Sequence, residues 1–412
     1  MRLAILGVGA GLAWAIVANT ASDSLAERDP ETALAWRDNA KALIRLAQES
    51  LQRDGAKVDT TRLRDLADQA LKTTPLESPA LWVLGSAAEI DGDAATAKKL
   101  MSLAAERSRR DPVVQTWLFY QLSREGRFAE ALGFADALLR TRPNQRDAIG
   151  PTLLAYAADP TAMRSLTLLL AADPPWRGWY LTEVGKQVKD PGIAYALFDA
   201  LKDGRSPPSA AELSPHLDAL IGAGLFEQAY LTWIHHLPAD RQQRLALAYN
   251  GDFEQPVSGL PFDWSIGRVA GAETRTVAPG YGGDGASIEV TFSGRRVAYR
   301  HLRKLMMLPP GHFRLKLQGR ADALVNERGL VWRVSCAEGE KQSLASTPPV
   351  IGSFAWRAFS VDFDVPNEAC RAQWLTLLVD ARTALEQSVD GSAGFDGIDV
   401  ERLPVPREQA AR

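Results

Sequence analysis

Two consecutive stretches decide the fold of the N-terminal part of this sequence: residues 81–104, LWVLGSAAEIDGDAATAKKLMSLA, and residues 115–138, QTWLFYQLSREGRFAEALGFADAL. In each stretch, apolar positions at helical spacing lie before and after a glycine, which predicts two amphipathic helices joined by a turn. Closely packed helices need Gly or Ala where they cross, because a larger side chain would push the backbones apart. The residues that recur after 34 positions are Leu84 and Leu118, Gly92 and Gly126, and Ala97 and Ala131.

Helix pairs of this kind resemble the tetratricopeptide repeat, whose unit of about 34 residues has small residues at the crossing. Gly224 and Ala229 keep the five-residue spacing of the two earlier turns, whereas the stretch 147–205 is helical but departs from the pattern. We expect residues 29–248 to form a tetratricopeptide-like solenoid, with an irregular helical bundle as the alternative. A solenoid offers a concave surface for a protein partner.

One dipeptide marks several of the expected helix starts. An aspartate at the N-cap accepts otherwise unpaired N–H groups, and a proline at the next position loses no helical hydrogen bond. The dipeptides are Asp29-Pro30, Asp111-Pro112, Asp159-Pro160, Asp173-Pro174 and Asp190-Pro191. Their recurrence predicts many short helices and not a few long ones.

The N-terminal segment is apolar. Residues 3–18 carry no charged side chain, and a single Arg2 precedes them. A run of this length is intermediate between a signal-peptide core and a short spanning helix, with a buried core helix as the third alternative. We interpret residues 1–21 as a signal peptide or an N-terminal anchor. Either predicts an exported, periplasmic protein, held at the inner membrane if the segment is retained.

The character of the sequence changes at residues 250–254, NGDFE, from helical periodicity to alternating segments separated by Gly and Pro. Alternation of apolar and polar residues indicates strands with one buried face. We expect residues 249–404 to form an antiparallel β-sandwich of jelly-roll kind and residues 405–412 to be a disordered tail. The strand-like runs are 286–292, 313–317, 330–335, 358–363, 374–379 and 398–403.

The two ends of this region resemble the first and last strands of carbohydrate-binding jelly-roll modules. The residues that carry the resemblance are 250–254, NGDFE, and 395–400, FDGIDV. Members of that family often hold a structural calcium near these ends, so the resemblance nominates Asp252, Glu254 and Asp399 as oxygen ligands. The alternative is that these carboxylates are simply solvated.

Tryptophans of this region could contact a sugar, because an aromatic face packs well against C–H groups. Trp332 and Trp374 lie inside the strongest strand patterns, so we expect both in the core. Trp264 and Trp356 are the candidate glycan contacts, with core packing as the alternative for each.

The only two cysteines of the sequence are Cys336 and Cys370. They lack Cys-x-x-Cys zinc spacing and are too few for a disulfide scaffold. An exported location allows them to form one disulfide, which we favour over two free thiols.

Charge and motifs argue against several classes of protein. The 47 basic residues nearly balance the 50 acidic ones, so no strong field favours nucleic acid. Motifs of zinc proteases, serine hydrolases, P-loops and dinucleotide binding are missing from the sequence, so we expect no enzyme and no cofactor beyond a structural calcium. A glycan-active hydrolase is the enzymatic alternative, because it needs two carboxylates and Glu289, Glu327 and Asp362 are available, although no spacing singles out a pair.

The two resemblances together imply a non-enzymatic envelope scaffold that supports exopolysaccharide assembly or export. The solenoid would bind a protein of that machinery, and the sandwich would bind glycan or a second protein. The other non-enzymatic interpretation is an assembly factor for envelope proteins without affinity for sugar.

Overall fold

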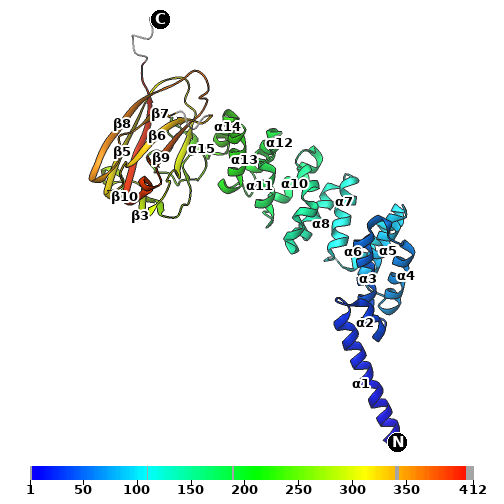
Figure 1. The fold of residues 1–412 in the computed structure, drawn as a ribbon. Helices are drawn as coiled ribbons and strands as arrows, with labels where there is room; N and C mark the ends of the chain where they lie inside the picture. Colours follow the sequence, from blue (N-terminus) through cyan, green and yellow to red (C-terminus); the bar gives the residue numbers. More distant parts are fainter. Residues whose placement is uncertain (1, 109, 188–189, 339–342, 405–412) are drawn as a thin grey trace. The chain divides into compact units, whose positions relative to one another are not determined.

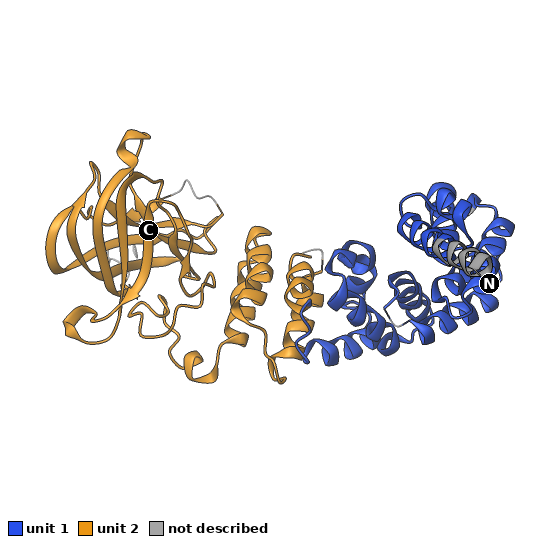
Figure 2. Cartoon of the chain, turned by 90° about the horizontal axis from the view of Figure 1, so that it is seen from below, with its two compact units in different colours: residues 1–176 blue, residues 177–412 orange. Residues whose placement is uncertain are grey.

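The computed structural model of the protein describes residues 2–108, 110–187, 190–338 and 343–404. Helices extend to Gln242 and strands begin at Ser265 (Figure 1). The predicted fold class, helical hairpins followed by an antiparallel β-sandwich, is confirmed. The chain divides into two compact units, residues 1–176 and 177–412 (Figure 2). The predicted tail, residues 405–412, lies outside the described residues.

Unit 1 is helical. Its helices are α1 (Arg2–Leu25), α2 (Pro30–Trp36), α3 (Ala40–Asp54), α4 (Thr60–Thr73), α5 (Ser78–Ile90), α6 (Ala94–Arg107), α7 (Pro112–Arg124), α8 (Phe128–Thr141), α9 (Arg146–Ala155) and α10 (Pro160–Leu170). Short 3₁₀ turns, η1 (Gly55–Lys57) and η2 (Pro143–Gln145), precede α4 and α9. Helix α3 packs on α4, α5 on α6, and α7 on α8, so neighbouring helices form hairpins.

The predicted period appears in two of these hairpins, because α7 and α8 begin 34 residues after α5 and α6. Gly92 and Gly126 occupy the two turns with φ of 83° and 72°, a region that L side chains rarely adopt. A Cβ on Gly85 would lie 3.2 Å from Cγ of Met101, so helices α5 and α6 cross closely there. The geometry matches the expected helix pair, and membership of the tetratricopeptide family stays a prediction.

Four of the five Asp-Pro dipeptides begin helices. Asp29, Asp111, Asp159 and Asp190 are N-caps whose carboxylates accept backbone N–H groups of the first turn. The prediction is wrong for Asp173, which has a left-handed φ of 53° and donates its N–H to Leu170 at the end of α10. It therefore terminates the preceding helix.

Helix α1 contains most of the predicted signal peptide or anchor, residues 1–21. Trp14 and Ile16 are largely exposed, and the ring of Trp14 lies 5.7 Å from that of Trp36. Over the described residues, no helix is both long and apolar enough to span a membrane. The side chains of residues 2–13 lie outside the described part, and the signal peptide or anchor stays a prediction.

Unit 2 contains the remaining helices and all of the named strands. The helices are α11 (Arg177–Gly185), α12 (Pro191–Lys202), α13 (Ala210–Gly222), α14 (Phe226–His236) and α15 (Ala239–Gln242). The strands are β1 (Ser265–Ile266), β2 (Ala272–Val277), β3 (Ser287–Arg296), β4 (Leu302–Met306), β5 (Gly311–Val325), β6 (Leu330–Cys336), β7 (Ser343–Ser346), β8 (Gly352–Val365), β9 (Gln373–Val379) and β10 (Ser388–Arg402). Short 3₁₀ turns, η3 (Tyr281–Gly283) and η4 (Leu385–Gln387), precede β3 and β10.

The strands form two five-stranded antiparallel sheets. Sheet A has the order β1-β4-β9-β6-β7, and sheet B has the order β2-β3-β10-β5-β8. Alternate residues of each strand point into the space between the sheets, as period-two patterning requires. In β6, for example, Trp332 is fully buried and its ring packs at 5.4 Å from that of Phe395 in β10.

Helix α14 packs directly on the sandwich. The rings of Tyr230 and Trp233 lie 5.2 and 5.6 Å from that of Phe262, and Trp233 also packs on Tyr249. The predicted domain boundary, residue 249, lies between the last helix and the first strand, whereas the compact unit that contains the sandwich begins at Arg177.

A buried lysine lies where the chain enters the sandwich. Lys304 of β4 is almost inaccessible to solvent, and its Nζ donates to the carbonyl oxygen of Tyr249. The same Nζ lies 4.7 Å from the centroid of the Trp264 ring. Burial lowers the pKa of Lys304 to about 7, although the negative charges of Asp263 and Asp252 act in the opposite direction.

This lysine predicts a pH-dependent stability. Between pH 7 and 9 the unfolded chain holds a proton on Lys304 and the folded chain does not, so stability rises with pH by about 1 kcal/mol per unit. Below pH 7 both states are protonated and the rise stops. Guanidinium denaturation at pH 7, 8 and 9 measures the slope, and Lys304→Met should remove it. An equal slope in wild type and variant would contradict this assignment.

Candidate functional site

A row of opposed residues crosses the outer face of sheet A. The register pairs Ser265 with Arg303, Arg303 with Thr376, Thr376 with Arg333, and Arg333 with Ser346. Directly opposed residues of antiparallel strands project from the same face of a sheet. This sheet A row therefore alternates three hydroxyl side chains with two guanidinium groups, one residue from each strand.

A cavity of about 230 Å³ lies over this row and is called the sheet A cleft. The row contributes Arg303, Thr376 and Arg333 to its lining. Side chains from neighbouring positions add an aromatic ring, a hydroxyl, an amide and a carboxylate, from Trp374, Ser335, Gln387 and Asp380. The cleft thus combines hydrogen-bond donors and acceptors with apolar side chains, the Trp374 ring among them.

The aromatic ring and the first arginine of the cleft are stacked. Cζ of Arg303 lies 4.3 Å from the centroid of the Trp374 ring, and the indole is 8% exposed. Across the described ranges no hydrogen bond or ion pair engages the guanidinium of Arg303. Stacking occupies the face of a guanidinium and leaves its N–H donors, which lie in the plane, available.

The carboxylate of the cleft is bound by two arginines. Arg333 donates to Oδ1 of Asp380 at 2.8 Å, and Arg328 donates to Oδ2 at 3.0 Å. Burial alone would raise the pKa of Asp380, but these hydrogen bonds lower it below its ordinary value. Asp380 therefore stays ionised at neutral pH and acts as an acceptor, not as a proton donor.

Sheet B carries a different row on its outer face. The register pairs Arg275 with Glu289, Glu289 with Gly394, and Gly394 with Arg320. Arg275 and Arg320 donate to the two oxygens of Glu289 at 3.2 and 2.8 Å. A Cβ on Gly394 would lie 2.8 Å from Nε of Arg320, so the glycine lets this arginine reach Glu289 across β10. These four residues are called the sheet B row.

Trp356 borders a cavity of about 730 Å³ beside the sheet B row. Its ring is half-buried, with Cζ of Arg320 at 5.3 Å and the ring of Tyr281 at 5.9 Å. A role of Trp356 in glycan binding stays a prediction.

Trp264 is a core residue, so its prediction as a glycan contact is wrong. Its ring is fully buried between those of Phe253 and Trp332, at 5.2 and 5.7 Å. Its Nε1 donates to the carbonyl oxygen of Asn250 at 2.7 Å. An enclosed ring cannot stack on a ligand from solvent.

Trp374 is buried, as expected, but on the outer side of sheet A and not between the two sheets. Along β9, Leu375, Leu377 and Val379 point inward, and Trp374 lies on the opposite face with Thr376. Both faces of this strand carry large apolar side chains, so the sequence shows no clear alternation of apolar and polar residues that would separate the inner face from the outer one. The polar residues Thr376 in β9 and Arg333 in β6 could have indicated which face of these strands points outward.

The predicted calcium ligands divide between two places. Asp252 and Asp399 line one cavity of about 240 Å³ together with Arg244. Glu254 instead accepts the backbone N–H of Ala286 at 2.9 Å. Within the part of the chain that the structure describes, no group of three or more His, Cys, Asp or Glu side chains could hold a metal ion. The proposed set does not form a calcium site, and a structural calcium stays a prediction.

The sequence analysis missed one buried acid near these loops. Asp396 accepts the N–H groups of Tyr281 and Gly397 at 2.7 and 2.6 Å. Burial raises its pKa, and the negative charges of Glu254 and Asp252 add to that effect. Asp396 belongs to the segment 395–400, FDGIDV, that carries the resemblance, and this could have drawn attention to it.

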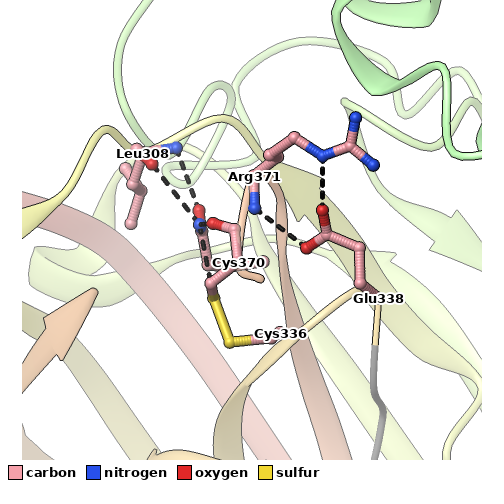
Figure 3. Close-up of a disulfide and its surroundings, with 6 residues drawn as sticks. Leu308, Cys336, Glu338, Cys370 and Arg371 are labelled. Carbon is pink, nitrogen blue, oxygen red and sulfur yellow. Dashed lines mark hydrogen bonds and ion pairs between the residues drawn. A yellow bond between two sulfur atoms is a disulfide. The ribbon is translucent and has the colours of Figure 1, made fainter. Parts of the chain in front are cut away.

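Cys336 and Cys370 form a disulfide with an S–S distance of 2.06 Å (Figure 3). It joins the last residue of β6 to the segment that precedes β9. Beside it, Arg371 donates from its backbone N and from Nε to the carboxylate of Glu338, at 2.9 and 2.6 Å. Gln373 donates to the carbonyl oxygen of Cys370 at 2.7 Å, so the start of β9 is held at several points.

The carboxylates of the hydrolase interpretation are not brought together as a pair. Glu289 is engaged by the two arginines of the sheet B row. Asp362 is bound by Arg314 at 2.5 and 2.8 Å, and this hydrogen bonding lowers its pKa. Glu327 is exposed and lines none of the three cavities described above.

Comparisons with known proteins give structural similarity only. No family model and no curated protein matches the sequence. A solved structure described as "CBM4 structure and function" shares 13% identity over 38% of this chain and 99% of its own, with a TM-score of 0.29. The CBM22-1–GH10 modules of Clostridium thermocellum endo-1,4-β-D-xylanase 10B with xylohexaose share 16% sequence identity. The match covers 37% of this chain and 28% of that one, with a TM-score of 0.26. TmCBM61 with β-1,4-galactotriose shares 16% sequence identity over 39% of this chain and 99% of its own, with a TM-score of 0.25. We draw no function from similarities of this size.

Proposed function

We propose that the protein is a non-enzymatic glycan-binding scaffold of the cell envelope that supports polysaccharide assembly or export. The sandwich holds a glycan in the sheet A cleft, and the helical hairpins hold a protein of the same machinery. The observation that carries this proposal is the cleft itself, because it combines an aromatic side chain with hydroxyl and guanidinium donors.

The lining of the cleft matches the chemistry of a sugar. A pyranose presents C–H groups that pack on an aromatic ring and hydroxyls that exchange hydrogen bonds with polar side chains. Trp374 borders the cavity beneath Arg303 and supplies apolar surface. Thr376, Ser335 and Gln387 supply groups that can both donate and accept.

A separate cavity in unit 1 supports the binding of a protein segment. Helices α6, α7 and α8 line a cavity of about 600 Å³. Leu118, Leu122 and Phe134 contribute apolar surface, and Lys98 and Glu130 contribute charge. Apolar pockets with a charged rim suit an amphipathic peptide.

Two further observations support a binding protein of the envelope. A disulfide such as Cys336–Cys370 persists in oxidising compartments outside the cytoplasm. Among the described residues that line the sheet A cleft, Asp380 is the one carboxylate, and two arginines bind it. Glycoside hydrolysis generally uses two carboxylates, one of them able to donate a proton.

Binding of the full-length chain to a panel of immobilised polysaccharides tests this function. We expect binding to at least one polysaccharide and a loss of about 10-fold in affinity for Trp374→Ala, since the variant removes apolar surface of the cleft and the ring that supports Arg303, together about 1 kcal/mol or more. Trp356→Ala, on the other sheet, tests the alternative glycan contact and should bind as wild type does if the cleft holds the glycan. Absence of binding by the wild-type chain, or loss with Trp356→Ala alone, would overturn the assignment of the cleft.

A further inference from the structure

We infer that the glycan held in the sheet A cleft carries carboxylate groups, as a polymer containing uronic acids does. This inference rests on the proposed function and names its ligand class. It follows from the arrangement of Arg303, Thr376 and Arg333.

The sheet A row places a short side chain between two long basic ones. Arg303 and Arg333 both lie opposite Thr376, on the strands to either side of it. Neighbouring strands are about 4.8 Å apart, so the two arginine Cα atoms are separated by about 10 Å across the row. Arg303, Thr376 and Arg333 all line the same cavity. Arg333 donates to Ser346 and Asp380, so the guanidinium of Arg303 is the group with donors left for an anion in this cavity.

The sheet B row also has two arginines on the outer face of a sheet, and both form ion pairs. There the chain supplies a carboxylate of its own, Glu289, to Arg275 and Arg320. In the sheet A row the residue between the arginines is Thr376, which carries no charge. Arg333 has a carboxylate of the chain in Asp380, whereas among the described residues Arg303 forms no ion pair, so an anion that pairs with Arg303 would come from a ligand.

The charges that face the cleft favour an anion. Its described lining contains Arg303 and Arg333 beside a single acid, Asp380, which Arg328 and Arg333 already bind. The positive charge of Arg303 acts on Asp218 of α13, yet the described residues contain no ion pair between the two. The cleft thus retains positive charge that its own acids do not neutralise.

The stacking of Arg303 suits a carboxylate in particular. Because its guanidinium lies over the Trp374 ring, the N–H donors point along the plane of the group and not into the ring. Two parallel N–H groups match the two oxygens of a carboxylate in a bidentate pair. A neutral hydroxyl uses only one of these donors.

The test compares acidic polysaccharides with their own neutral forms. Sodium polygalacturonate, alginate and glucuronoxylan are each titrated into the full-length chain before and after chemical reduction of the carboxyl groups. We expect at least one acidic polymer to bind at least 10-fold more tightly than its reduced form. Its affinity should also fall as salt rises from about 50 to about 500 mM.

Substitutions assign the effect to the cleft. Arg303→Gln should lose about 10-fold or more in affinity for the acidic polymer and nothing for a neutral one. Arg303→Lys keeps the charge but not the bidentate fork and should fall between the two. Arg314→Gln is the matched control, because Arg314 pairs with Asp362 on sheet B and lies outside the cleft.

The outcomes separate this inference from the proposed function. Equal affinity for acidic and reduced polymers, with binding still lost in Trp374→Ala, overturns the acidic ligand and leaves a neutral glycan scaffold. Absence of binding to any polysaccharide overturns both. If Arg303→Gln fails to fold, the acidic and reduced pair on the wild-type chain still decides the question.

Discussion

Replacing Trp264 with alanine should lower the free energy of unfolding of the sandwich by about 3–5 kcal/mol, the range for a large aromatic residue in a packed core. The ring is fully buried, so its removal leaves a cavity. It also leaves the carbonyl oxygen of Asn250 without its indole donor and Lys304 without the aromatic face beside its Nζ. All three effects act in the same direction.

Hydrogen exchange of full-length protein, read by mass spectrometry on peptides from β6 and β9, measures this loss within the sandwich. Trp264→Phe keeps one ring and loses the hydrogen bond and part of the ring volume, so it should cost less than Trp264→Ala. Trp356→Ala, on a half-buried ring at the outer face, should cost under about 1 kcal/mol. A Trp264→Ala variant that stays stable but loses glycan affinity would restore Trp264 as a binding residue and contradict its place in the core.

Local features of the fold could be predicted from the sequence because their causes lie within a few residues. Asp111 caps α7 through the N–H groups that follow it, and Gly92 takes the positive φ that the turn requires. The prediction that Asp173 begins a helix failed for a physical reason. An Asp-Pro pair can end one helix as well as begin another, and the backbone angle that decides between these outcomes depends on α10.

The candidate site could not be predicted in the same way, because it depends on register between distant strands. Arg303, Thr376 and Arg333 are separated by dozens of positions and meet only because β9 pairs with both β4 and β6. A shift of one residue would point Thr376 into the core. For Trp374 the sequence gives no face at all, since apolar residues fill both sides of β9.

Removing the Cys336–Cys370 disulfide, by reduction or by a Cys336→Ser and Cys370→Ser double substitution, should lower the stability of the sandwich by about 3–4 kcal/mol. The bond closes a loop with a sequence separation of 34, and a loop of that length loses this much entropy in the unfolded chain. Because Cys370 lies just before β9, which carries Trp374 and Thr376, the loosened strand should also weaken glycan binding in the cleft.

Hydrogen exchange with and without reductant, and binding under the same conditions, measure both effects. Reductant acting on the double-Ser variant is the control, since it should change nothing. Unchanged protection of β6 and β9 after reduction of the wild-type chain would mean that strand pairing alone holds this edge of the sheet.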